Sequence, residues 1–267
     1  MKKKILVGSL FLVLFALLVG CGSKSEEKKL TIGATPVPHA ELLNLIKDDL
    51  AKEGITLEVK EFTDYVQPNI AVSNGDLDAN FFQHLPYLEN FCKEQNIELA
   101  SIATIHVEPL GLFSKKYTSL DQLPDGARIA VPNDPTNEGR ALLLLQAHDL
   151  ITLSETASLE GTVNDITSNP RNFEFSELEA AQLPRILDDF DGAIINGNYA
   201  LEADLSPAED ALLVEGAESP YANIIAVKKG DEKREDLAKL VEVLQSEKVE
   251  KYILDNYKGG VLPAFSK

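Results

Sequence analysis

The feature that most constrains the fold is a repeated alternation of short strand-like runs and longer helix-like runs. Between Ile55 and Val59 apolar residues occupy every second position, as in a strand with one buried face. Between Leu42 and Leu50 they recur at helical spacing, and Gly54 follows where a helix C-terminal cap is expected. This alternation predicts an α/β architecture with largely parallel sheets. We expect strands at 30–33, 55–59, 79–82, 99–106, 128–131, 192–195 and 223–227, and helices at 42–50, 85–95, 137–148, 176–187, 231–244 and 249–257.

The N-terminus has the three regions of a secretory signal. Three lysines at positions 2–4 precede an apolar run at 5–19, and Gly20 and Cys21 follow it. The run is shorter than the roughly 20 residues that a membrane-spanning helix needs, and no stop-transfer pattern follows. We therefore expect residues 1–20 to be a cleaved signal peptide.

The residues that end this segment predict a lipid anchor. The sequence Leu-Val-Gly-Cys at 18–21 resembles a bacterial lipobox, in which a diacylglyceryl group is transferred to the cysteine sulfur before cleavage. We expect an acylated Cys21 to hold the protein on the extracytoplasmic face of the cell membrane, because lipid methylenes bury in the bilayer. The alternative is an ordinary cysteine within a cleaved signal. Residues 21–29 are small or charged, which predicts a solvated tether. Cys92 is then left without a disulfide partner, and we expect it to be a buried thiol.

The charge of the chain excludes one class of partner. Lysine and arginine number 25 against 43 acidic residues, a net charge of −18, and loss of the signal lysines makes it more negative. Such a surface repels nucleic acid. The acidity favours solubility.

Two places along the chain predict crossings between lobes. Proline and glycine interrupt an apolar stretch at 108–111, and a second crossing is expected at 219–223, after which the chain reads as a strand and then helices. We expect lobe 1 to comprise residues 30–110 and 223–267, lobe 2 to comprise residues 111–222, and a cleft to lie between them.

Eight blocks in order resemble the methionine-binding lipoprotein family of bacterial ABC importers. One of them, Pro-Asn-Asp-Pro-Thr-Asn-Glu-Gly-Arg at 132–140, is typical of the set. The resemblance implies a type II-like periplasmic-binding-protein fold, with two lobes, each a mostly parallel sheet flanked by helices, that close on methionine. It also implies a membrane-embedded ABC permease with its ATPase as partner, no cofactor and no enzymatic activity. The blocks are 34–40, 65–69, 78–87, 106–110, 129–141, 179–185, 195–200 and 219–223.

An amino-acid ligand needs a partner for its carboxylate, acceptors for its ammonium and a matching pocket for its side chain. Arg140 lies just inside a predicted helix capped by Thr136 or Asn137, so a guanidinium and free backbone N–H groups can converge on a carboxylate. The alternative is a surface ion pair. Asn196 and Asn223 offer neutral amides, although Asn-Gly is also a turn signal. Aromatic faces suit a thioether, although each ring alone is as easily explained as core. The candidate ligand-binding residues are Tyr65, Phe82, His84, Tyr87, Asn137, Arg140, Asn196 and Asn223.

Other functions remain as alternatives. Metal capture would need His39, His84, His106 and His148 to converge, and no metal-ligand spacing supports this, so we expect no metal site. No hydrolase elbow or phosphate-binding loop indicates an enzyme. An adhesin with a vestigial cleft stays open. Within the methionine interpretation, D-methionine and methionine-containing dipeptides compete with L-methionine.

Overall fold

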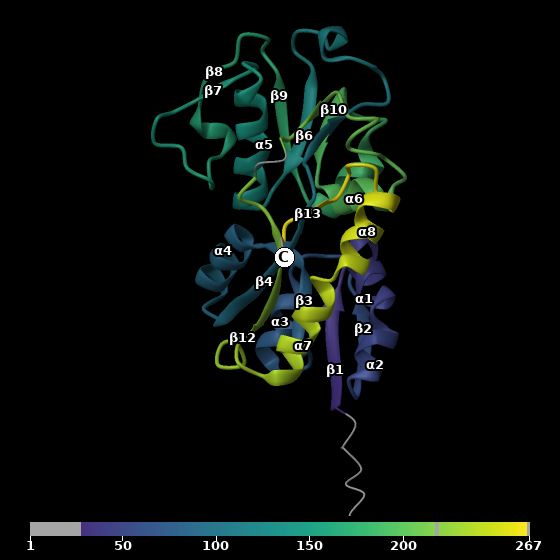
Figure 1. Cartoon of the computed structure of the whole chain (residues 1–267). Coiled ribbons are helices and arrows are strands. Elements are labelled where there is room, and N and C mark those ends of the chain that lie inside the picture. The colour runs from purple at the N-terminus through teal and green to yellow at the C-terminus, as the bar shows by residue number, and fades with distance from the viewer. Residues whose placement is uncertain (1–27, 217–218, 266–267) are drawn as a thin grey trace, which may run out of the picture.

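The computed structural model describes residues 28–216 and 219–265 (Figure 1). It has two mixed β-sheets, each covered by its own helices, and Figure 1 shows one above the other. Cys21 and the expected signal peptide lie outside the described residues. Within them, every helix is too short or too polar to cross a membrane.

The first sheet has the strand order β13-β4-β12-β3-β1-β2. β1 is parallel to β2 and β3, whereas β12 is antiparallel to both β3 and β4. The strands are β1 (Lys28–Ala34), β2 (Ile55–Glu61), β3 (Ala79–His84), β4 (Leu99–Val107), β12 (Asn223–Lys228) and β13 (Leu262–Pro263). The accompanying helical segments are η1 (Pro36–Ala40), α1 (Glu41–Leu45), α2 (Lys47–Lys52), α3 (Gln67–Asn74), α4 (Leu85–Gln95), α7 (Glu235–Leu244) and α8 (Glu247–Asn256).

The second sheet has the order β11-β5-β10-β6-β9. β6 is parallel to β9 and β10, whereas β5 is antiparallel to β10 and β11. Its strands are β5 (Gly111–Phe113), β6 (Arg128–Pro132), β9 (Glu174–Leu178), β10 (Gly192–Ile195) and β11 (Leu213–Val214), and a separate hairpin joins β7 (Thr152–Leu153) to β8 (Ile166–Ser168). The helical segments are η2 (Leu120–Gln122), α5 (Pro135–Ala147), η3 (Val163–Asp165), η4 (Ala180–Ile186) and α6 (Gly197–Glu202).

Each sheet buries its own apolar core. One cluster of buried side chains, on the first sheet and its helices, includes Ile32, Phe81 and Leu240. Another, on the second sheet, includes Leu112 and Ile129. Burying one such side chain stabilises a fold by about 1.5–3 kcal/mol. Because the two cores take up the apolar side chains, a binding site is expected among the polar residues that lie between them.

The α/β architecture is confirmed, but both sheets are mixed: β12 and β13 in the first sheet and β5 in the second run against the other strands. The chain leaves the first sheet at the end of β4 and returns at the start of β12. β12 therefore runs away from the junction between the sheets, while β3 and β4 run toward it.

The helix expected at 176–187 is also wrong. This segment forms the end of β9 followed by the 3₁₀ segment η4, which contains Pro184. A proline in that position lacks the N–H that an α-helix interior requires. Two smaller differences are that Ile46 separates α1 from α2, and that β1 begins at Lys28 within the expected tether.

Candidate functional site

One cavity gathers polar and aromatic residues from both sheets. Its empty volume, including space that is open to solvent, is about 310 Å³. All eight predicted ligand-binding residues line it, and so do Gln83, Glu108, Gly197 and Asn198, which the sequence interpretation did not select. The eight are Tyr65, Phe82, His84, Tyr87, Asn137, Arg140, Asn196 and Asn223.

Three aromatic rings form one wall of the cavity. The ring centroid of Tyr65 lies 5.7 Å from that of Phe82 and 5.8 Å from that of Tyr87. The Tyr87 hydroxyl donates to the Tyr65 carbonyl at 3.0 Å, and the Tyr65 hydroxyl donates to Asn198 Oδ1 at 2.5 Å. The wall is apolar and polarisable, and its hydroxyl groups are already engaged, which suits a thioether side chain.

Arg140 is buried and already holds several partners. Its Nε donates to Glu215 Oε1 at 3.1 Å, and its Nη2 donates to the Glu108 carbonyl at 2.8 Å and also to Glu215. The guanidinium lies over the Tyr221 ring, 4.4 Å from its centroid. Nη1 makes no hydrogen bond with any residue that the structure describes. The guanidinium is therefore held rigidly with one edge still open.

The helix that carries Arg140 begins earlier than the sequence suggested. Asp134 is the N-cap of α5 and Pro135 is its first residue, a position that proline favours. Asp134 Oδ1 accepts from the Asn137 N–H at 3.0 Å. The expectation that Thr136 or Asn137 caps this helix is wrong, and a carboxylate of the chain itself occupies the helix start.

A chain of hydrogen bonds runs from this cap into the cavity. Asn137 Nδ2 donates to both Asp134 carboxylate oxygens at 3.0 Å. Asn137 Oδ1 meets Asn196 Nδ2 at 2.8 Å and His84 Nε2 at 3.1 Å. His84 Nδ1 accepts from the Tyr87 N–H at 3.2 Å. Burial lowers the pKa of His84 to about 3, so this ring is neutral.

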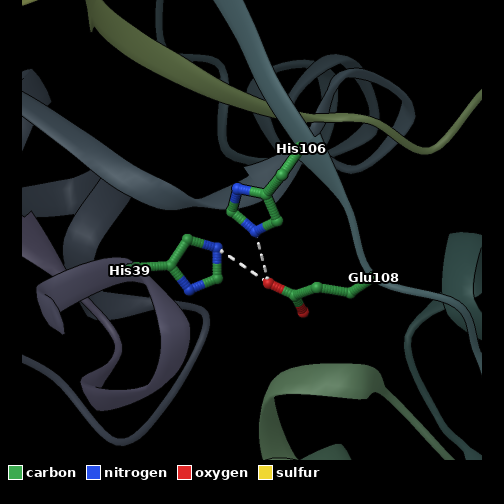
Figure 2. A group of neighbouring side chains, drawn as sticks. All are labelled: His39, His106 and Glu108. Atoms are coloured by element: carbon green, nitrogen blue, oxygen red, sulfur yellow. Dashed lines mark hydrogen bonds and ion pairs between the residues drawn. The ribbon is translucent and has the colours of Figure 1, made fainter. Parts of the chain in front are cut away.

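A second polar group surrounds Glu108 beside the cavity (Figure 2). Glu108 Oε1 lies 2.7 Å from His106 Nε2 and 3.2 Å from His39 Nε2. Its Oε2 accepts from the Asn198 N–H at 2.9 Å. Burial lowers the pKa of His39 to about 4 and that of His106 to about 3, and it raises the pKa of Glu108. His39 Nε2 also lies 3.3 Å from Asn223 Oδ1.

His39, His106 and Glu108 also have the composition of a metal site. Their nearest ligand atoms all lie within 4.8 Å of one another. No metal-ligand spacing in the sequence indicated this convergence, which is wholly tertiary. However, both Nε2 atoms and both carboxylate oxygens already have hydrogen-bond partners. Of the other histidines, His84 lines the cavity and His148 lies at the exposed end of α5.

Four buried side-chain polar atoms have no partner among the described residues: Asn196 Oδ1, Asn198 Nδ2, His106 Nδ1 and Tyr221 Oη. The first two belong to cavity-lining residues, one an acceptor and the other a donor. Leaving such an atom unpaired costs about 1–3 kcal/mol. The cavity therefore favours a ligand that carries both a donor and an acceptor.

Comparison with known proteins identifies the family of this chain. A profile of the NlpA lipoprotein family matches residues 30–265. The chain belongs to the NlpA lipoprotein family. This NlpA lipoprotein is an ABC transporter substrate-binding lipoprotein and not an enzyme. The D-methionine-binding lipoprotein MetQ of Escherichia coli is 42% identical to it, and the match covers 92% of each chain. The resemblance to methionine-binding lipoproteins is confirmed.

Two solved structures are similar over most of this NlpA lipoprotein. A nutrient-binding protein from Burkholderia cenocepacia, solved bound to methionine, has a TM-score of 0.86 and 45% identity. An ABC transporter periplasmic substrate-binding protein from Coxiella burnetii has a TM-score of 0.84 and 44% identity. Each match covers 88% of this chain and 100% of the other.

The expectation that Cys92 is a buried thiol is wrong. Cys92 is half-buried rather than buried, and it packs beside Leu88 and Ile224. Burial raises the pKa of its thiol.

Proposed function

We propose that this protein is the lipid-anchored receptor of an ABC importer, that it captures L-methionine outside the cytoplasm, and that it delivers it to the permease. The observation that carries the proposal is the composition of one small cavity: an open guanidinium edge, an unpaired donor, an unpaired acceptor and an aromatic wall. A zwitterionic amino acid with a polarisable side chain complements each of these. The methionine-bound relative from Burkholderia cenocepacia supports the same ligand.

The binding roles follow from the open atoms. Arg140 and Asn198 Nδ2 would receive the ligand carboxylate, and Asn196 Oδ1 would receive its ammonium. Asn223, whose Oδ1 lies near His39, would present its Nδ2 to the ligand. The aromatic wall would hold the thioether, while Asn137 and His84 would hold the amides in place.

Closure of two lobes is the proposed mechanism. The first sheet takes strands from 28–107 and 223–263, and the second from 111–214, which supports lobe 1 at 30–110 with 223–267 and lobe 2 at 111–222. A ligand that touches both lobes does so only when they are closed, and it therefore shifts the population to the closed state.

The ligand is tested by a thermal-shift screen of the twenty amino acids, D-methionine, methionine dipeptides and divalent metals. We expect L-methionine to give the largest rise in melting temperature, because a ligand stabilises only the state that binds it. A larger rise with D-methionine, which the name of the Escherichia coli relative includes, would reassign the enantiomer. A rise with zinc alone, which His39→Gln abolishes, would favour metal capture, and no rise at all would favour an adhesin.

The anchor is proposed at Cys21, on the extracytoplasmic face. Its support is the lipobox at 18–21 and the lipoprotein family to which the chain belongs. Cys21→Ala should leave an unprocessed precursor that incorporates no labelled fatty acid. Normal acylation of that variant would disprove the assignment.

A further inference from the structure

Asn196 Oδ1 is a buried acceptor without a partner in the wall of the cavity. The residue is 5% exposed, and its other amide atom, Nδ2, is used in a hydrogen bond to Asn137. An amide can turn over by exchanging its oxygen and nitrogen, so the acceptor faces the ligand only if something holds the amide in one orientation.

The hydrogen-bond chemistry of Asp134 supplies that constraint. Asp134 Oδ1 accepts from the Asn137 backbone N–H and from Thr136 Oγ1, so it acts as an acceptor. The side-chain atom of Asn137 that lies 3.0 Å from both Asp134 oxygens must then be its donor, Nδ2. The orientation of the Asn137 amide is fixed by this pair.

The constraint passes from Asn137 to two further residues. With Nδ2 turned to Asp134, Asn137 presents only Oδ1 to the cavity side, and an amide oxygen can only accept. Asn196 must therefore donate to it through Nδ2, at 2.8 Å, and His84 through Nε2, at 3.1 Å. His84 Nδ1 is left as an acceptor, and it takes the Tyr87 N–H at 3.2 Å. Every atom along this path has one possible role, and the acceptor that remains is Asn196 Oδ1.

We propose that Asp134 is a positioning residue for ligand specificity: acting through Asn137, it orients the Asn196 amide so that Oδ1 accepts a hydrogen bond from the ammonium group of an amino acid. This inference rests on the proposed function. It adds that the site selects the protonated amine of its ligand through a residue that is not among those lining the cavity. The hydrogen-bond chain also explains why the start of α5 is closed by a carboxylate instead of being open to the ligand.

The test compares two ligands that differ only in the amine. L-Methionine carries it, and 4-(methylthio)butanoate lacks it. Asp134→Asn keeps a good helix cap and one acceptor oxygen but replaces the second oxygen by a donor. We expect isothermal calorimetry, by competition for the weaker ligand, to show that this variant loses at least about tenfold in methionine affinity. The affinity for 4-(methylthio)butanoate should change by less than about threefold.

Controls separate positioning from general damage. Asp165→Asn alters a carboxylate that caps η3 and lies outside the cavity lining, and it should change neither affinity. Asn196→Leu removes the acceptor itself and should reproduce the methionine-selective loss. Asp134→Ser, which keeps a capping oxygen but cannot reach Asn137 Nδ2 in the same way, repeats the comparison if Asp134→Asn melts early.

The outcomes are distinguishable. Equal losses for both ligands, or no loss for either, would overturn the role of Asp134. Failure of the unaltered protein to bind methionine would instead overturn the proposed function.

Discussion

Arg140 makes contacts that a lysine ammonium at the same position could not reproduce. One guanidinium donates to Glu215 and to the Glu108 carbonyl while it lies over Tyr221. A lysine keeps the charge but has no planar fork, so it cannot hold these partners and a ligand carboxylate together. Arg140→Lys should therefore weaken methionine binding by about 1.5–3 kcal/mol in calorimetry. Arg185→Lys, at an exposed position, is the control, and equal affinities of the two variants would contradict the assignment.

His106 makes the stability of the fold dependent on pH. Burial lowers its pKa from 6.5 to about 3, so below pH 6.5 the unfolded chain binds a proton that the folded chain does not. The free energy of unfolding that depends on a neutral His106 is fully present above pH 6.5 and is lost as the pH falls toward 3. Glu138 and Glu202, with pKa values raised to about 7, act in the opposite direction, so a variant must isolate the effect.

The isolating variant is His106→Gln, whose amide can still donate to Glu108. Urea unfolding of the unaltered protein between pH 6 and 4 should lose stability more steeply than this variant, by about 1.4 kcal/mol per pH unit. His148→Gln, at an exposed site, should follow the unaltered protein. Parallel curves for His106→Gln and the unaltered protein would show that His106 does not titrate as proposed.

At the residue scale, sequence located the cavity but not the network within it. All eight candidates line one cavity, because each belongs to a block that the family resemblance singled out. Glu108 and Asn198 also lay in those blocks, yet their roles depend on His39 and Tyr65, which are distant along the chain. No spacing rule reports such contacts. Asp134 was missed because the cap was placed two or three residues too late.

Helix α6 shows how tightly one element must approach the junction between the sheets. A Cβ on Gly197, its first residue, would lie 2.6 Å from Glu108 Cβ, closer than real side chains allow. Gly197→Ala should displace α6, and with it the Asn198 N–H, which donates a hydrogen bond to Glu108 Oε2. We expect a lower melting temperature, by several degrees, and at least tenfold weaker methionine binding, as for other overpacked sites that cost about 1–3 kcal/mol.

The control for this substitution is Gly216→Ala, at a position after β11 where an added Cβ meets nothing within 4 Å. It should change neither the melting temperature nor the affinity. If Gly197→Ala behaves in the same way, the close approach of α6 to Glu108 is not needed for binding.

The sequence predicts which helices and strands form better than it predicts the direction in which each strand runs. The strand at 192–195 and the helix at 85–95 have the bounds expected from pattern. The direction of β12 could not be inferred, because it depends on where the chain re-enters the first sheet. The error at 176–187 arose because apolar spacing outweighed Pro184, which ends α-helical geometry.

At the scale of the molecule, the two sheets divide the chain close to the proline-glycine interruption at 108–111 and to the proline-containing segment at 219–223. The first sheet ends at Val107 and resumes at Asn223, and the second lies between them. Sequence indicated these two points through local turn chemistry, and the lobe bounds drawn from them stay a prediction. It could not show how far each half reaches across, which depends on contacts such as Tyr65 with Asn198.

That contact allows closure to be tested directly. The Tyr65 hydroxyl, from the half that contains the first sheet, donates to Asn198 Oδ1 of α6 at 2.5 Å. If closure is a shift of population, methionine should reduce the radius of gyration in small-angle X-ray scattering. Tyr65→Phe removes one closing hydrogen bond, worth about 0.5–1.5 kcal/mol, and should require up to about tenfold more methionine for the same compaction. Tyr117→Phe, at a partly buried position packed against the core of the second sheet, should leave the titration unchanged. An unchanged radius in a protein that calorimetry shows to be saturated would mean that methionine enters a site that is already closed.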